Sequence, residues 1–137
     1  MSDFRPSRFQ VLPMVIKNLL IINGLMFLAT IVVQNTYHID LTDYLGLRFF
    51  TSDFFRPHQL VSHMFMHGNF LHIFSNMFSL WMFGSVLENV WGPKRFLIFY
   101  MVCGIGGALT HQAVSGYEIY QAHQLANEFS ASPDAAN

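Results

Sequence analysis

The sequence has little charge and almost no cysteine. Charged residues make up 11% of the 137 positions, about half the share usual in soluble globular domains. Hydrophobic residues make up 53%, so a soluble domain of this size would lack the charge to cover its surface. The net charge of −1 gives no electrostatic support for nucleic-acid binding, and the single cysteine, Cys103, excludes an internal disulfide. The low content of charged residues and the high content of hydrophobic residues favour an integral membrane protein.

Three apolar runs have the length that a bilayer-spanning helix requires, about 20 residues each. They cover residues 15–33, 70–90 and 96–114. We therefore expect an all-α integral membrane protein with about three transmembrane helices. Asn23 is the deep polar group of the first run, where an interhelical hydrogen bond is the expected role.

The segments between and around these runs differ in composition. Residues 34–62 mix aspartates and arginines with aromatic side chains, which predicts an interfacial amphipathic loop with short helices. Gly92–Arg95 is interpreted as a tight turn. The expected division is a cytoplasmic segment over 1–14, a membrane domain over 15–114 and a polar tail over 115–137. Within the tail, Tyr117–Phe129 is compatible with a short helix, and Ser130–Asn137 is expected to be disordered.

A cluster of polar side chains stands at the beginning of the second run. His63 and His67 are four residues apart, and His72 and Asn76 repeat that spacing, so on a helix each pair would share a face. Polar groups at membrane depth are costly to bury and indicate function by default. The cluster is therefore the candidate site.

The residues between the two pairs predict a break in the helix. Gly68 and Asn69 lie there, and Asn69 is expected to cap a helix that begins near Phe70. On that helix the polar side chains would form a single stripe made of His72, Ser75, Asn76 and Ser79.

Several kinds of chemistry are compatible with this stripe. An imidazole and a carboxamide one turn apart can direct N–H donors at one point, and an oxyanion donor is worth on the order of 3 kcal/mol. That arrangement suits acyl transfer such as peptide hydrolysis. Zn²⁺ binding by His63 and His67 is an alternative, with no clear third ligand beyond His72 or His58. Ser75 is a weaker candidate nucleophile, because a helical serine usually bonds back to the preceding turn. The purely structural interpretation is that the histidines only satisfy their hydrogen bonds at the membrane interface. We expect no metal and no cofactor.

The pattern His63-x3-His67-x4-His72-x3-Asn76, followed by Gly84-x3-Glu88 and Trp91-Gly92, resembles the second transmembrane helix of rhomboid intramembrane serine proteases. The resemblance covers about Val15 to Val114. It implies a partial rhomboid-like bundle whose partners are the transmembrane helices of substrate proteins and the lipid bilayer. It also implies roles for single residues: oxyanion stabilisation by His72 and Asn76, a water-filled cavity lined by His63 and His67, and a structural tie between the helix and its cytoplasmic turn by Glu88.

The sequence departs from the family where the catalytic dyad would lie. The family's nucleophile lies in Gly-x-Ser-Gly at the start of a fourth helix, whereas Ala113-Val114-Ser115-Gly116 is the nearest approach here. The family's base histidine lies on a sixth helix, and neither His111 nor His123 follows an apolar segment that would place it there. We therefore expect a chain like the N-terminal half of a rhomboid, inactive alone. The alternative is a non-catalytic membrane protein that binds transmembrane helices.

The distribution of Lys and Arg predicts the orientation. Positive residues flank the first run and follow the second, whereas residues 34–62 offset two arginines with three aspartates and residues 115–137 have none. The N-terminus and the Gly92–Arg95 turn are thus expected in the cytoplasm, with a bacterial inner membrane as the expected location. The histidine cluster and the tail then face outward.

Reporter fusions test this orientation. Fusions after Gln34, Lys94 and Asn137 should report outside, inside and outside, because the positive-inside rule fixes the first helix and each later span reverses the chain. An inside signal at Asn137 would contradict the predicted topology.

Overall fold

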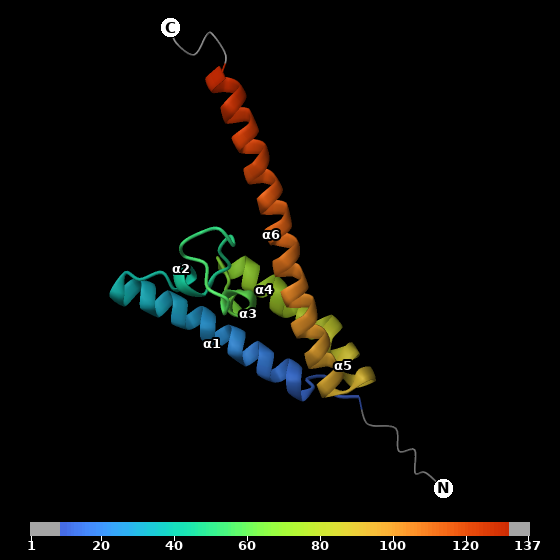
Figure 1. The fold of residues 1–137 in the computed structure, drawn as a ribbon. Coiled ribbons are helices and arrows are strands. Elements are labelled where there is room, and N and C mark those ends of the chain that lie inside the picture. The colour runs from blue at the N-terminus through green and yellow to red at the C-terminus, as the bar shows by residue number, and fades with distance from the viewer. Residues whose placement is uncertain (1–8, 132–137) are drawn as a thin grey trace.

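The computed structural model describes residues 9–131, which are mostly helical and contain no strand (Figure 1). Three of its helical stretches, Met14–Tyr37, Phe70–Trp91 and Pro93–Ala131, are long and apolar enough to cross a membrane. The predicted all-α membrane fold with three spans is thus confirmed. In chain order the elements are α1 Met14–Tyr37, α2 Leu41–Leu45, α3 Gln59–Ser62, the 3₁₀-helix η1 His63–Phe65, α4 Phe70–Ser79, the π-helix η2 Leu80–Gly84, α5 Ser85–Trp91 and α6 Pro93–Ala131.

The second span begins at a side-chain cap and contains a wider turn in its middle. The Asn69 side chain accepts a hydrogen bond of 2.8 Å from the backbone N–H of His72, which confirms the predicted start of α4. The π-helix η2 then joins α4 to α5. Such turns frequently occur at functional sites in helices.

The first span begins against the end of the second. The residue before α1 is Pro13, which provides no side-chain cap. The buried carboxylate of Glu88, on α5, instead accepts hydrogen bonds of 2.9 Å from the backbone N–H groups of Val15 and Ile16. A negative charge at a helix N-terminus satisfies free donors and complements the helix dipole. Glu88 therefore caps α1 from a position more than 70 residues away.

Two further side chains of the second span hold the segment that precedes α1. Asn89 accepts a bond of 2.9 Å from the backbone N–H of Gln10 and donates one of 2.8 Å to its carbonyl. Trp81 donates through its indole N–H to the carbonyl of Val11 at 3.1 Å. The chain is thus fixed against α5 before α1 begins.

The apolar core is small and lies where the three spans meet. Ile16 and Leu19 of α1 pack with Phe96 of α6, and all three are buried. Gly84 allows this contact, because a Cβ atom there would lie 2.4 Å from Ile16 Cδ1. Large apolar side chains on the outer face of α1, such as Leu25, are exposed, as expected of a surface that contacts lipid.

Two buried glutamines organise the loop between α1 and α4. Gln59 is 1% exposed; its side chain accepts from two backbone N–H groups of the loop and donates to two of its carbonyls. Gln112 of α6 donates to the carbonyl of Arg48 at 2.6 Å and accepts from the N–H of Phe50 at 3.2 Å. The predicted loop with short helices is therefore present, and α6 anchors it.

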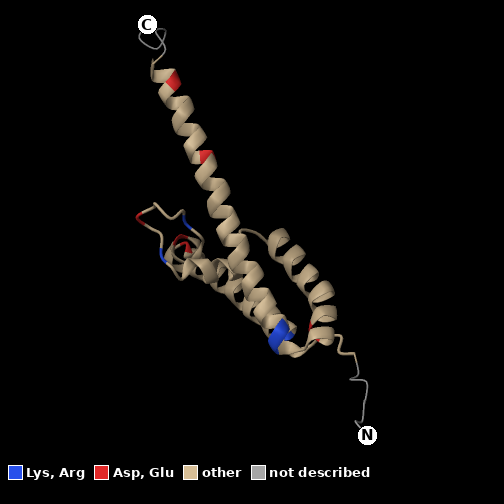
Figure 2. Ribbon diagram, turned by 45° about the vertical axis from the view of Figure 1, so that its right-hand side comes forward, with Lys and Arg blue, Asp and Glu red and all other residues tan. Residues whose placement is uncertain are grey.

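The structure corrects two expectations about the last third of the chain. The turn after α5 is Gly92 alone, with a φ of 83°, and Lys94 and Arg95 already lie in the first turn of α6. Figure 2 shows these positive residues at the start of α6 and acidic residues near its far end.

The second correction concerns the tail. Instead of ending near Val114, α6 continues to Ala131, so the separate helix expected over Tyr117–Phe129 is part of it, and Ser130 is helical. Its last turns project beyond the other helices (Figure 1). Residues 132–137, and residues 1–8 of the expected N-terminal segment, lie outside the described range.

Replacing Glu88 should destabilise the fold. The variant Glu88→Ala leaves the first N–H groups of α1 without a buried acceptor, which should lower the free energy of unfolding by about 2–3 kcal/mol. Unfolding by dodecyl sulfate in mild detergent, followed by circular dichroism, measures the loss.

Glu118→Ala is the matched control, because Glu118 is an exposed glutamate on α6. Equal shifts of the unfolding midpoint in both variants would show that the Glu88 cap does not stabilise the fold.

Candidate functional site

The stripe of polar side chains lies on the exposed surface of α4. His72 and Asn76 are one helical turn apart, and both are exposed in the described chain. Ser75 and Ser79 are exposed too, whereas Ile73, on the neighbouring face, is buried. The helix therefore packs through Ile73, while the polar stripe and apolar side chains such as Phe74 both remain exposed.

The structure brings His67 next to His72. Their ring centroids are 5.1 Å apart with an interplanar angle of 65°. His67 is 6% exposed, and its Nδ1 atom is buried without a hydrogen-bond partner among residues 9–131. The candidate site is therefore a buried imidazole behind an open imidazole and an open carboxamide.

The expected helical face shared by His63 and His67 is absent. The 3₁₀-helix η1 ends at Phe65, and the following Met66 is extended, so the two histidines do not lie on one helix. His63 turns back along the chain, with Nδ1 at 2.9 Å from the carbonyl oxygen of Gln59. His63 thus faces the loop while His67 faces α4.

The alternative of a metal site gains no support from the geometry. Across residues 9–131, no three His, Cys, Asp or Glu side chains are placed to hold one metal ion. The His58 ring is engaged elsewhere, because its Nε2 lies 3.1 Å from the carbonyl oxygen of Tyr44.

The serine beside His72 on α4, Ser75, is bonded to backbone. The hydroxyl of Ser75 donates to the carbonyl of Leu71 at 2.8 Å and contacts that of His72 at 3.2 Å. Ser115 lies on α6, where its neighbour Gly116 is close to the Phe49 ring of the loop. In the described part of the chain, no serine hydroxyl is hydrogen-bonded to a histidine ring.

Burial determines the charge state of His67. It lowers the pKa of the His67 imidazole, and positive charge on the adjacent His72 lowers it further. His67 is therefore neutral at neutral pH, and one of its ring nitrogens remains an acceptor.

Sequence reasoning missed the side chains that support this site. Asn89 and Trp81 hold the chain before α1, and Gln59 and Gln112 hold the loop in front of α4. For Asn89 and Gln112, the available signal was an amide side chain within an apolar run. It marks a polar group that must be satisfied but does not identify its partner.

Three bilayer-length helices and an open histidine–asparagine face define the class: an all-α integral membrane protein with a polar site on its second span. The family pattern described as Rhomboid domain matches residues 55–121. That match includes the histidine cluster, the second span and most of α6. Together with the relatives below, it supports the assignment of this chain to the rhomboid family.

Several curated proteins are similar over part of the chain. RHOMBOID-like protein 5 of Arabidopsis thaliana is 41% identical over 51 residues, which are 37% of this chain and 16% of that protein. Rhomboid protease GluP of Bacillus subtilis (strain 168) is 30% identical over 59 residues, 43% of this chain and 12% of that protein. The mitochondrial RHOMBOID-like protein 12 of Arabidopsis thaliana is 35% identical over 54 residues, which are 39% of this chain and 16% of that protein. The matches thus span less than a fifth of each relative. No solved structure matches significantly.

The low pKa of His67 predicts acid sensitivity of the fold. Neutral His67 contributes its full stability above the unfolded-state pKa of about 6.5, and that contribution is lost as the pH falls below this value. The test measures the unfolding midpoint at pH 7.5 and at pH 5, roughly one unit either side of that pKa. Between these two pH values, the midpoint should fall less in His67→Gln than in the wild type. His111→Gln, which alters an exposed histidine of α6, should retain the wild-type dependence. Identical pH profiles for His67→Gln and wild type would refute the prediction.

Proposed function

We propose that this chain supplies the oxyanion-binding side of an intramembrane serine endopeptidase of the rhomboid type, and that it is inactive alone. The observation that carries the proposal is the open pair His72 and Asn76 on a membrane-spanning helix, with His67 directly behind it. The proposed partners are transmembrane helices of substrate proteins. The proposed location is the bacterial inner membrane with the N-terminus in the cytoplasm.

The chemistry follows from what the two side chains can donate. Peptide hydrolysis passes through a tetrahedral intermediate whose oxygen carries negative charge. An imidazole N–H of His72 and the amide N–H of Asn76, one turn apart, can both point at that oxygen. Both donors are held by one helix, so they are already oriented before charge develops on that oxygen.

His67 has a separate proposed role behind this pair. Its neutral ring lies against the His72 ring and carries a polar atom without a protein partner in the described chain. Such an atom is suited to bind water. Water is the second substrate of hydrolysis, so we assign His67 to holding water beside the reacting bond. The cavity-lining role that the resemblance implies for His63 is not part of this proposal, because its ring faces the loop and not α4.

The proposed inactivity rests on the missing hydrogen bond between a serine and a base. His111 and Ser115 are four apart on α6, yet no hydrogen bond joins them in the described chain. Nucleophilic catalysis by serine requires such a bond to an oriented base. The same observation supports the alternative function, a non-catalytic protein that binds transmembrane helices.

Labelling by a fluorophosphonate tests inactivity. The purified chain in detergent should remain unlabelled and should leave a transmembrane substrate intact, because no serine is activated. Rhomboid protease GluP of Bacillus subtilis serves as the positive control. Labelling of Ser75 or Ser115 that His72→Ala abolishes would make the chain an enzyme on its own.

A fusion separates the catalytic proposal from the alternative. A downstream segment with Gly-x-Ser-Gly and a later helical histidine should create cleavage, and His72→Ala or Asn76→Ala should lower kcat about 100-fold by removing an oxyanion donor. Gln124→Ala, which removes an exposed amide of α6, should have no effect. If neither site variant changes kcat of an active fusion, the oxyanion role is wrong; an inactive fusion that still binds transmembrane helices favours the alternative.

A further inference from the structure

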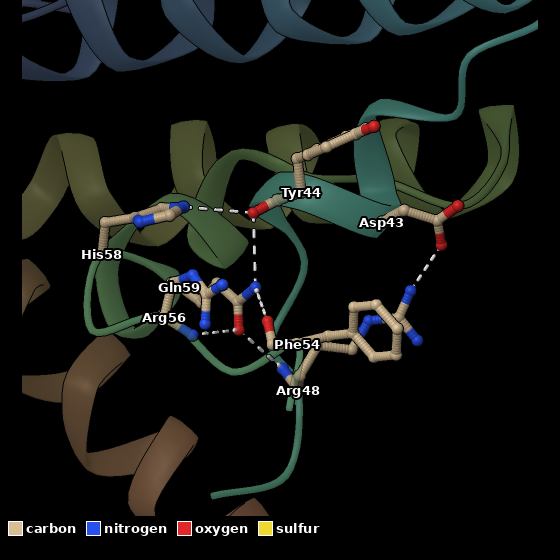
Figure 3. Close-up of a pocket in the computed structure, with 7 residues that line it drawn as sticks. All are labelled: Asp43, Tyr44, Arg48, Phe54, Arg56, His58 and Gln59. Atoms are coloured by element: carbon tan, nitrogen blue, oxygen red, sulfur yellow. Dashed lines mark hydrogen bonds and ion pairs between the residues drawn. The ribbon is translucent and has the colours of Figure 1, made fainter. Parts of the chain in front are cut away.

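A cavity in the loop between α1 and α4 lies apart from the histidine site. It has a volume of about 610 Å³ and is formed by α2, the residues after it and the start of α3 (Figure 3). Arg48, Arg56 and His58 contribute to its lining, with Asp43 as the acidic residue. Among the residues that line the cavity, two arginines and one aspartate leave a net positive charge, which favours an anion over a cation. Asp40 lies outside this lining but interacts electrostatically with Arg48.

The backbone N–H groups of the two arginines are bonded to the same side-chain oxygen. The buried Oε1 atom of Gln59 accepts the backbone N–H of Arg48 at 3.2 Å and that of Arg56 at 3.3 Å. The Nε2 atom of the same amide donates to the carbonyls of Tyr44 and Phe54. The amide of Gln59 is fully bonded (dashed lines in Figure 3), and this buried side chain forms the floor of the cavity. The backbone positions of the two arginines are therefore set by the fold.

Each guanidinium keeps donors that the protein does not use. Arg56 donates through Nη1 to the carbonyls of Asp53 and Phe55, at 3.1 and 3.0 Å, and its other nitrogens have no partner among residues 9–131. Arg48 pairs through Nη2 with the carboxylate of Asp43. Both side chains of that pair are well exposed, so the pair is weak and a more highly charged anion can compete with Asp43.

Exposed aromatic side chains stand beside these donors. Phe54 is 73% exposed and Tyr44 is 64% exposed, and both line the cavity. Aromatic residues left open in this way are typical of the membrane–water interface. Guanidinium groups bind phosphate oxygens in pairs with geometric specificity.

We propose that this cavity binds the phosphate group of a phosphate ester, held by Arg48 and Arg56 above the Gln59 floor. The phosphate can come from the headgroup of an anionic phospholipid at the interface or from a soluble phosphate ester. The site is independent of the catalytic proposal, because none of its residues belongs to the histidine face.

Native mass spectrometry of the full chain in neutral detergent tests the proposal. Phosphatidylglycerol should remain bound as a discrete adduct, and the double variant Arg48→Gln/Arg56→Gln should reduce its occupancy about tenfold through the loss of two charge-assisted contacts. The control Lys94→Gln/Arg95→Gln removes the same charge at the start of α6 and should keep the adduct. Equal loss in both double variants would overturn the proposal, because it would show binding by net charge alone.

A gain of binding provides a second test that does not depend on how the loop tolerates the lost arginines. Asp43→Asn frees the Arg48 guanidinium, so it should raise phosphatidylglycerol occupancy severalfold over wild type. Unchanged or lower occupancy in this variant would contradict the assignment of Arg48.

Soluble competitors identify the source of the phosphate. If glycerol 3-phosphate or inorganic phosphate displaces phosphatidylglycerol at comparable concentration, the site binds a soluble phosphate ester. If neither displaces it and phosphatidylcholine does not replace it, the ligand is an anionic lipid headgroup. Binding of neither lipid nor soluble phosphate by the wild type would refute the site.

Discussion

The carboxylate of Glu88 is the interaction on which the arrangement of the three spans depends. It caps α1 from the end of α5. The first span must therefore begin at the level where the second span ends. The contact is buried, and both carboxyl oxygens of Glu88 accept free N–H groups of the helix start. With α1 fixed there, Ile16 and Leu19 meet Phe96, and the small core closes around Gly84.

The candidate site follows from what this core leaves uncovered. α4 packs through Ile73, and the opposite end of the second span is fixed by Glu88, while the stripe with His72 and Asn76 stays exposed in the described chain. The break before Asn69 then places His67 against the His72 ring. A polar face that a membrane protein holds open at the start of a span suits a site that must admit water and a substrate.

Sequence reasoning succeeded where a pattern is local. Apolar length predicted the three spans, and Gly68-Asn69 predicted the cap of α4, because each depends on residues that are neighbours along the chain. The partner of Glu88 could not be predicted, because it lies more than 70 residues away and nothing in either segment specifies the other. The resemblance pointed to a structural role for Glu88 at the following turn, whereas its side chain reaches α1.

Two expectations, the end of the third helix and the shared face of His63 and His67, were wrong for physical reasons that can be traced to the sequence. The apolar run ends near Val114, but the helix does not, because no proline interrupts the chain between Pro93 and Ala131. A fall in hydropathy marks the end of a span and not the end of a helix. His63 and His67 have helical spacing, but η1 ends at Phe65, and spacing has meaning only within one helix.

The central claim is that the His72–Asn76 face is open to water while the rest of the second span faces lipid or protein. Single cysteines in a Cys103→Ala background measure this directly through labelling with a membrane-impermeant maleimide. Asn76→Cys should react rapidly, and Phe74→Cys should not, because Phe74 is exposed on the opposite, apolar face of α4. Equal labelling of the two positions, or labelling of Phe74→Cys alone, would contradict the account.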